Sequence, residues 1–352
     1  MIHQANGHIY PSLCRRSRSI KITYPLDLLS GVQSLVCSKK LQHYLSSWCS
    51  RHRFLMMSGV EESDDMMFCA SCGIAEVDEV KLKKCACNLV RYCGAKCQKE
   101  HRSQHKQACK KRAAEFRDEL LFKQPESTFL GDCPICCLPL SVDDHNSTML
   151  SCCCKTICDG CDYANDMRVW RESLKWSCPF CRHPASRSKD ESNQNLIKRI
   201  EANDPVAMCE MGLGLHDEGD IEGAFEYLTQ AAALGDAAAH FELSLLYHNG
   251  EVGKDEKKEV YHLEEAAIRG HTRARHNLGI IEERNGRRDR GMKHLIIAAK
   301  LGDSKSVAAL KRGYRFGLVS KEDFASALRG HQAAVDETKS PQRDEALAAQ
   351  KD

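Results

Sequence analysis

Cysteine is the residue type whose number and spacing point most directly to chemistry in this 352-residue sequence. Seventeen of its 21 cysteines lie between Cys69 and Cys181, and many of them form pairs with one to three residues between them. Thiolate and imidazole are ligands that Zn²⁺ prefers, four to an ion. Disulfides are the alternative, but they need an oxidising compartment, and the N-terminus lacks the apolar core of a secretory signal. The cysteines therefore predict zinc binding in the cytoplasm or nucleus.

The first group of candidate ligands lies in residues 66–110 and closes with a His-x3-Cys pair, whose members share one face of a helix. It comprises Cys69, Cys72, Cys85, Cys87, Cys93, Cys97, His105 and Cys109. Eight ligands are enough for two zinc ions. The string Tyr92-Cys93-x3-Cys97-Gln98 followed by His105-x3-Cys109 resembles a MYND-type zinc finger.

The resemblance to the MYND-type finger implies an interleaved ligand order. One ion would be held by Cys69, Cys72, Cys93 and Cys97, and the other by Cys85, Cys87, His105 and Cys109. The sequence departs from the family pattern twice. The third pair, Cys85-Ala86-Cys87, is one residue shorter than the usual Cys-x2-Cys, and Arg102 stands where the family tends to carry a tryptophan that grips proline-rich peptides. The alternative is a module that only folds around zinc and binds nothing else.

The second group of candidate ligands lies in residues 131–185 and again offers enough sulfur for two ions. It comprises Cys133, Cys136, the run Cys152-Cys153-Cys154, Cys158, Cys161, Cys178 and Cys181. Its order and spacing resemble a RING-type finger, in which the two sites are cross-braced. The resemblance implies that Cys133, Cys136, Cys158 and Cys161 hold one ion. Cys178 and Cys181 would hold the other, together with two cysteines of the run.

The run of three cysteines is where the sequence departs from the RING pattern. The family usually has Cys-x-His before the third ligand pair, and Lys155 occupies the histidine position. The sequence leaves open which two cysteines of the run bind the metal. We choose Cys152 and Cys153, which leaves Cys154 outside the site.

A RING-type finger positions a ubiquitin-conjugating enzyme and forms no covalent intermediate, so its contribution to catalysis is orientation. The resemblance places the family's docking elements at Ile135, before the second ligand, at Pro179, after the seventh, and at Arg182, after the eighth. The guanidinium at the last position carries five N–H donors in a planar fork. The alternative is a RING-shaped scaffold without ligase activity, in which these three residues serve packing and surface charge.

Residues 201–335 contain an internal repeat. The pattern Ala-Ala-x-x-Gly ends at Gly235, Gly270 and Gly302, with spacings of 35 and 32 residues. A period in this range is typical of an α-solenoid of helix pairs. Asp204, Asp220, Asp236 and Asp303 are expected at helix starts, and Gly235, Gly270, Gly286 and Gly302 at helix ends. The units resemble Sel1-like repeats, relatives of tetratricopeptide repeats, which implies that the solenoid recruits partner proteins.

The remaining segments are predicted from composition. Residues 1–65 form a basic, Ser-rich extension, since residues 1–55 hold eight Lys and Arg against one acid. This is the composition of an organelle transit peptide, but we favour an extension without a targeting signal, or a translation start at Met56 or Met57. Residues 111–130 are predicted as a connecting helix that Pro125 ends, residues 186–200 as a linker and residues 336–352 as a polar tail.

The predicted fold is multidomain, with two small zinc-stabilised α+β modules followed by an all-α solenoid. The predicted function is that of a zinc-dependent, RING-type ubiquitin ligase whose repeats recruit substrate, and the rival is a non-enzymatic zinc-finger scaffold. Nucleic acid is not an expected partner, because residues 56–352 are net acidic. A membrane is not expected either, because no apolar run reaches about 18 residues. A catalytic zinc keeps one position open, whereas every predicted site has four protein ligands.

Overall fold

The computed structural model describes residues 67–350, apart from residues 78–79, 86, 88 and 143–145. The predictions for the extension at residues 1–65, including a possible targeting signal and the alternative translation start, concern residues outside the described ones. No described helix combines the length and the apolarity that crossing a membrane requires.

The first module consists of a two-stranded sheet and the start of a long helix. Strand β1 (Lys83–Lys84) pairs antiparallel with β2 (Arg91–Tyr92), with Lys83 opposite Tyr92. Helix α2 (Ala95–Leu121) follows. The buried core comprises Cys69, Leu82, Cys85, Cys87 and Tyr92. Three of these five residues are cysteines, so apolar burial alone supplies little stability and the module depends on metal.

Helix α2 begins in the first module and continues into the segment predicted as a connecting helix. Its 27 residues end at Leu121, before the predicted stop at Pro125. The chain leaves the helix at Phe122, whose N–H still bonds to the carbonyl of Asp118 and whose ring packs on His294, with 4.7 Å between centroids. Tertiary packing of Phe122 thus ends the helix before the proline does.

The second module contains one hairpin and one helix. Strand β3 (Ser147–Leu150) pairs antiparallel with β4 (Lys155–Cys158), and Ser147 lies opposite Cys158. Helix α3 (Asp159–Arg171) follows β4 directly. Cys133, Leu140, Ile157, Cys158 and Cys161 form the buried core. As in the first module, cysteines account for most of it.

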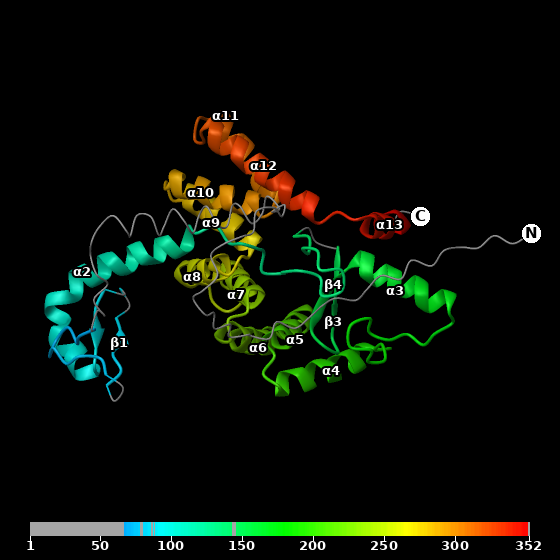
Figure 1. The fold of residues 1–352 in the computed structure, drawn as a ribbon, viewed down its shortest axis with the longest axis horizontal. Helices are drawn as coiled ribbons and strands as arrows, with labels where there is room; N and C mark the ends of the chain where they lie inside the picture. The colour runs from blue at the N-terminus through cyan, green and yellow to red at the C-terminus, as the bar shows by residue number, and fades with distance from the viewer. Residues whose placement is uncertain (1–66, 78–79, 86, 88, 143–145, 351–352) are drawn as a thin grey trace, which may run out of the picture. The chain divides into compact units, whose positions relative to one another are not determined.

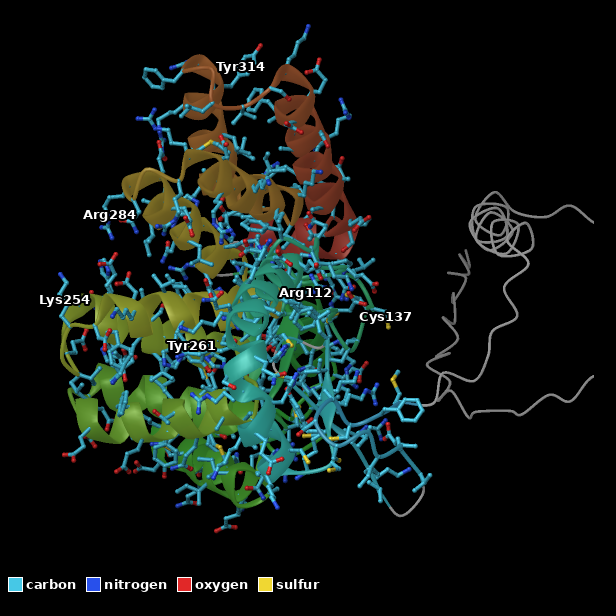
Figure 2. The ribbon with its side chains drawn as sticks, turned by 90° about the vertical axis from the view of Figure 1, so that its left-hand side faces the viewer. Arg112, Cys137, Lys254, Tyr261, Arg284 and Tyr314 are labelled. Carbon is cyan, nitrogen blue, oxygen red and sulfur yellow. The ribbon has the colours of Figure 1, made fainter. Side chains whose placement is uncertain are left out.

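The solenoid is a series of antiparallel helix pairs (Figure 1), which Figure 2 shows turned by 90° with the side chains drawn. The pairs are α5 (Pro205–Asp217) with α6 (Ile221–Ala233), α7 (Ala237–Asn249) with α8 (Glu256–Ile268), α9 (Thr272–Arg284) with α10 (Arg288–Lys300), and α11 (Ser304–Arg315) with α12 (Lys321–Glu337). The predicted solenoid of helix pairs is confirmed. Small residues bring the helices of a pair close together, and a Cβ on Gly291 would lie 2.7 Å from the carbonyl oxygen of Gly279.

The predicted helix boundaries follow from capping. Asp204, Asp220, Asp236 and Asp303 each accept a hydrogen bond from a main-chain N–H in the first turn of the helix they precede. The glycines expected at helix ends are Gly235, Gly270, Gly286 and Gly302, and all four have φ between 79° and 98°. That conformation costs glycine little and other residues about 1–2 kcal/mol.

The segments predicted as a linker and as a polar tail each contain a helix. The predicted linker at residues 186–200 contains most of α4 (Lys189–Glu201), which Ser188 caps by accepting from the N–H of Glu191. The predicted polar tail at residues 336–352 contains α13 (Pro341–Ala349), capped by Ser340. A serine side chain thus caps each of these two helices. Both are stabilised by packing on the second module, which sequence periodicity does not reveal.

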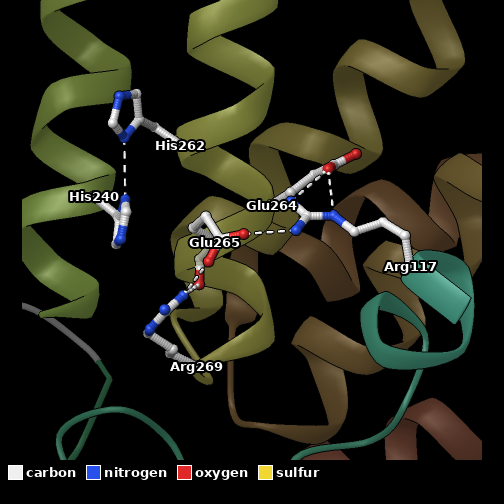
Figure 3. Close-up of polar contacts among 6 residues, drawn as sticks. All are labelled: Arg117, His240, His262, Glu264, Glu265 and Arg269. Carbon is white, nitrogen blue, oxygen red and sulfur yellow. Dashed lines mark hydrogen bonds and ion pairs between the residues drawn. The ribbon is translucent and has the colours of Figure 1, made fainter. Parts of the chain in front are cut away.

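Helix α2 docks on the solenoid through its last turns. Arg117 pairs with Glu264 and Glu265 of α8, at 2.7 and 2.6 Å (Figure 3). Leu121 is fully buried among apolar residues of α7, α8 and α9. Arg290 of α10 reaches Asp118 at 2.6 Å. The long helix therefore connects the first module to the centre of the repeats.

Candidate metal centres

Three tight turns of similar geometry supply six of the fifteen predicted cysteine ligands. Each turn begins with Cys-x2-Cys, and the residue after its second cysteine donates its N–H to the carbonyl of the first. These bonds run from Gly73 to Cys69, from Cys137 to Cys133 and from Arg182 to Cys178, at 2.8–2.9 Å.

The residue that closes each of these turns is left-handed. Gly73, Cys137 and Arg182 have φ of 74°, 58° and 62°. The first cysteine of each turn also donates its own N–H to a carbonyl five residues on, which pins the turn at both ends. A turn of this shape points both sulfurs of the pair to one side, where a single ion can bind them.

The first cluster gathers the sulfurs of Cys69, Cys72, Cys93 and Cys97, all within 4.8 Å of one another. Cys93 follows β2, and Cys97 lies in the first turn of α2. The sulfur of Cys93 lies 3.6 Å from that of Cys72 and 3.5 Å from that of Cys97. A zinc ion bonded tetrahedrally at about 2.3 Å separates its sulfurs by about 3.8 Å, so the spacing suits zinc.

The electrostatics of the first cluster favour one thiolate even before metal binds. Burial opposes charge on Cys69, but main-chain N–H groups of Cys72, Cys93 and Ser71 outweigh it and lower the pKa of Cys69 to about 6. Hydrogen bonds to neighbouring thiols raise the pKa of Cys93 to about 12. Four thiolates can therefore coexist here only with a cation between them.

The second cluster gathers Cys85, Cys87, His105 and Cys109. Cys85 sulfur lies 3.4 Å from Cys109 sulfur, and Cys87 sulfur lies 3.1 Å from Nε2 of His105. The shortened Cys-x-Cys pair thus still brings both sulfurs to the cluster. The N–H of Cys85 bonds to the carbonyl of Val90, which closes the loop that carries the pair.

Two rings outside the second cluster fix the orientation of its histidine. His101, one turn earlier on α2, stacks on His105 with 5.5 Å between ring centroids. The hydroxyl of Tyr92 lies 3.0 Å from Nδ1 of His101. Burial and the neighbouring thiols Cys85 and Cys87 raise the pKa of Tyr92, so its hydroxyl stays protonated. The stacked ring therefore restricts rotation of the His105 imidazole.

The third cluster gathers Cys133, Cys136, Cys158 and Cys161. The last two cysteines flank the start of α3, and the sulfur of Cys136 lies 3.7 Å from that of Cys158. Hydrogen bonds from Cys158 and Cys161 lower the pKa of Cys133 against the opposing effect of burial. The main-chain N–H of Cys158 also points at this sulfur, at 3.5 Å.

The fourth cluster gathers Cys152, Cys153, Cys178 and Cys181. Cys181 sulfur lies 3.4 Å from Cys152 sulfur, and Cys153 sulfur lies 3.9 Å from Cys178 sulfur. The structure therefore brings together the two cysteines chosen from the run.

Cys154 points away from the fourth cluster. It packs with Leu196 of α4 and Ala207 of α5. Burial raises the pKa of its thiol to about 11. Cys154 thus belongs to the contact between the second module and the solenoid.

The four clusters are four zinc sites, two in each module, so the predicted cofactor and its stoichiometry are confirmed. Each site offers three or four sulfurs and at most one imidazole nitrogen, which is the donor set of structural zinc. Four protein ligands leave no position for a substrate. The ions would therefore hold the modules together and take no part in bond making.

The three residues predicted to contact a partner lie on the surface of the second module. Ile135 is 41% exposed. Arg182 is exposed and Pro179 is half-buried. Pro179 also lines a groove of about 180 Å³ whose walls include Trp176, Asp162 and Asp166. Sequence reasoning missed the last three residues, because no ligand spacing marks them.

Comparison with known proteins finds two family models that match parts of the chain. The MYND finger model matches residues 69–109, and the Sel1 repeat model matches residues 205–236 and 237–271. Neither model covers residues 131–185. No match appears among curated proteins.

Three solved structures are similar to about half of the chain at low sequence identity. The Sel1 repeat protein from Oxalobacter formigenes is 21% identical and covers 51% of this chain and 72% of its own, with a TM-score of 0.38. A protective antigen of uropathogenic Escherichia coli with an SLR fold is 15% identical, covers 53% and 50%, and has a TM-score of 0.29. MamA is 17% identical, covers 42% and 87%, and has a TM-score of 0.28.

The family matches agree with the two outer parts of the sequence prediction. The chain carries a MYND finger and Sel1 repeats, and repeats of this kind generally mediate protein–protein interaction. The finger and the repeats together indicate a zinc-binding scaffold for protein–protein interaction. The resemblance of residues 131–185 to a RING-type finger has no matching family model and stays a proposal.

Proposed function

We propose that the chain is a ubiquitin ligase of RING type, in which residues 131–185 position a conjugating enzyme and the repeats hold a partner protein. The observation that carries the proposal is the interleaved order of clusters three and four. Cys152 and Cys153 belong to the fourth cluster, yet they lie in sequence between the two halves of the third. Cross-braced sites of this order are what the RING resemblance implies.

The exposed side chains of the second module support docking of a conjugating enzyme. Ile135 offers an uncovered apolar contact next to one zinc turn, and Arg182 offers donors next to the other. Between them in sequence, Trp176 is 54% exposed and borders the groove at Pro179. A large exposed aromatic ring beside a groove is a common anchor for protein partners.

The charge of the groove adds a preference for the partner. Burial raises the pKa of Asp162 and, together with the nearby Asp162 carboxylate, that of Asp166. A cationic side chain inserted there would stabilise both carboxylates as anions. We therefore expect a conjugating enzyme with basic residues on its docking loop.

Self-ubiquitination by the full chain across a panel of conjugating enzymes tests the proposal. Ile135→Ala and Arg182→Ala should each remove the ubiquitin ladder. The matched controls are Ile197→Ala and Arg329→Ala, which alter exposed residues on α4 and α12. A ladder that survives in the controls and disappears in the docking variants supports the proposal. No ladder from a chain that holds four zinc ions contradicts it.

The second candidate is a scaffold that uses zinc only for folding. It is favoured by the ion pairs and the buried Leu121 that join α2 to the repeats, since they make the first module a fixed part of the solenoid. The two candidates differ in one observable. If the chain is only a scaffold, it transfers no ubiquitin, and Ile135→Ala and Arg182→Ala bind its partner as well as the parent does.

A further inference from the structure

The C-terminal helix reaches back to the third zinc cluster through one side chain. The guanidinium of Arg343 donates through Nη1 to the carbonyls of Pro139 and Thr338, at 2.7 and 2.8 Å. Through Nη2 it donates to the carbonyl of Leu138 at 3.2 Å and to the sulfur of Cys136 at 3.5 Å. Cys136 is one of the four sulfurs of that cluster.

The backbone of the same helix lies against the other half of the cluster. Gly160, between Cys158 and Cys161, accepts a hydrogen bond from Nε2 of Gln342 at 2.9 Å. A Cβ on Gly160 would lie 2.9 Å from the main-chain nitrogen of Arg343, so the close approach requires glycine at this position. Nearby, Gln350 donates to Asp159 at 3.2 Å. Helix α13 thus touches both segments that supply ligands to one ion.

The negative charge of the metal-bound cluster explains what these contacts do. Four thiolates around one Zn²⁺ carry a net charge of about −2, and groups that donate to such sulfurs hold them in place and temper their charge. A guanidinium is a permanent cation with a planar set of donors, so one side chain can bind the sulfur, two carbonyls of the zinc turn and the carbonyl of Thr338 at the end of α12.

We propose that Arg343 is an outer-shell residue of the third zinc site and that α13 is a clasp which retains the ion there. This role concerns metal retention and is independent of ubiquitin transfer. Without the side chain, the turn at residues 133–139 loses its tie to residues 158–161, and a chelator removes this ion faster than the other three.

Native mass spectrometry of the full chain during chelation tests the clasp. In Arg343→Ala we expect one of the four ions to leave about 10-fold faster than in the parent, the lower end of the usual outer-shell effect. Arg343→Lys should fall between the two, because an ammonium keeps the charge but lacks the planar fork. Gly160→Ala, which displaces α13 from the module side, should also speed the loss. Arg329→Ala is the matched surface control and should match the parent.

A second readout separates the outer-shell role from simple packing of α13. In the cadmium-113 form, the resonance that Cys136→Ser removes identifies the third site. That resonance should shift in Arg343→Ala and Arg343→Lys, while the other three stay in place. Release at the parent rate in Arg343→Ala would overturn the proposal. Faster release with an unmoved resonance would also overturn it, by limiting Arg343 to holding the helix.

Discussion

Arg275 of α9 donates to the main-chain oxygen of Leu121 at 2.5 Å, although 154 residues separate them in sequence. The guanidinium is fully buried and also bonds to the carbonyl of Ala267 at 2.8 Å. Burial lowers the pKa of Arg275 to about 10, so it remains a cation at neutral pH. A buried cation that donates to the last carbonyl group of a helix is favoured by the helix dipole. This hydrogen bond anchors the C-terminal end of α2 to the repeats.

Replacing Leu121 should destabilise the repeats as well as the first module. Leu121→Ala removes a fully buried side chain that packs with apolar residues of three solenoid helices. We expect a loss of about 2–5 kcal/mol in the free energy of unfolding, measured by urea denaturation of the repeats. Leu120→Ala, one residue earlier and 39% exposed, is the matched control and should cost less than about 1 kcal/mol. Equal midpoints for the two variants would show that α2 does not dock as described.

Removing zinc should unfold the two modules and leave the solenoid folded. The module cores consist largely of metal-binding sulfurs, whereas the repeats bury aliphatic side chains such as Leu228, Leu278 and Leu310. After chelation we expect fast amide hydrogen exchange in residues 69–93 and 133–161 and continued protection in α5–α10. Loss of protection throughout the repeats would contradict this separation.

The two neighbouring cysteines Cys153 and Cys154 should differ sharply in their effect on metal content. Cys153→Ser removes a predicted ligand and should reduce the bound zinc from four ions to three by native mass spectrometry. Cys154→Ala should keep all four, because its sulfur packs against Leu196 and Ala207. Three ions in the Cys154 variant would mean that the ligand assignment in this run is wrong.

Stability of the repeats should fall in mild acid because of buried imidazoles. Burial lowers the pKa of His271 to about 3, well below its ordinary value of 6.5. The unfolded chain therefore binds a proton more readily than the folded one, so the stabilisation is complete above about pH 6.5 and declines as the pH falls toward 3.

The variant His271→Asn should reduce this pH dependence. His271 caps α9 by accepting from the N–H of Ala274, and asparagine can make the same bond without titrating. Urea midpoints at pH 7 and pH 5, followed by hydrogen exchange in α7–α9, measure the effect. Loss of zinc in acid affects parent and variant alike. An unchanged pH dependence in the variant would rule out His271 as its source.

Local patterns explain which parts of the fold the sequence predicts. Ligand spacing and the 35- and 32-residue intervals between Gly235, Gly270 and Gly302 depend only on neighbours in sequence, so the modules and helix pairs are predictable. The end of α2 depends instead on Phe122 meeting His294, and α13 depends on Gly160 and the third cluster. No local pattern encodes such long-range contacts, which is why Arg343 had no signal in the sequence.

The most direct test of ligase activity is single-turnover discharge of ubiquitin from a charged conjugating enzyme onto free lysine. The full chain with four zinc ions should accelerate discharge at least about 10-fold. Arg182→Ala should lose that acceleration while keeping its metal, because only positioning is removed. If the fully metallated chain leaves the discharge rate unchanged with every conjugating enzyme in the panel, the ligase proposal is contradicted and the chain acts as a scaffold alone.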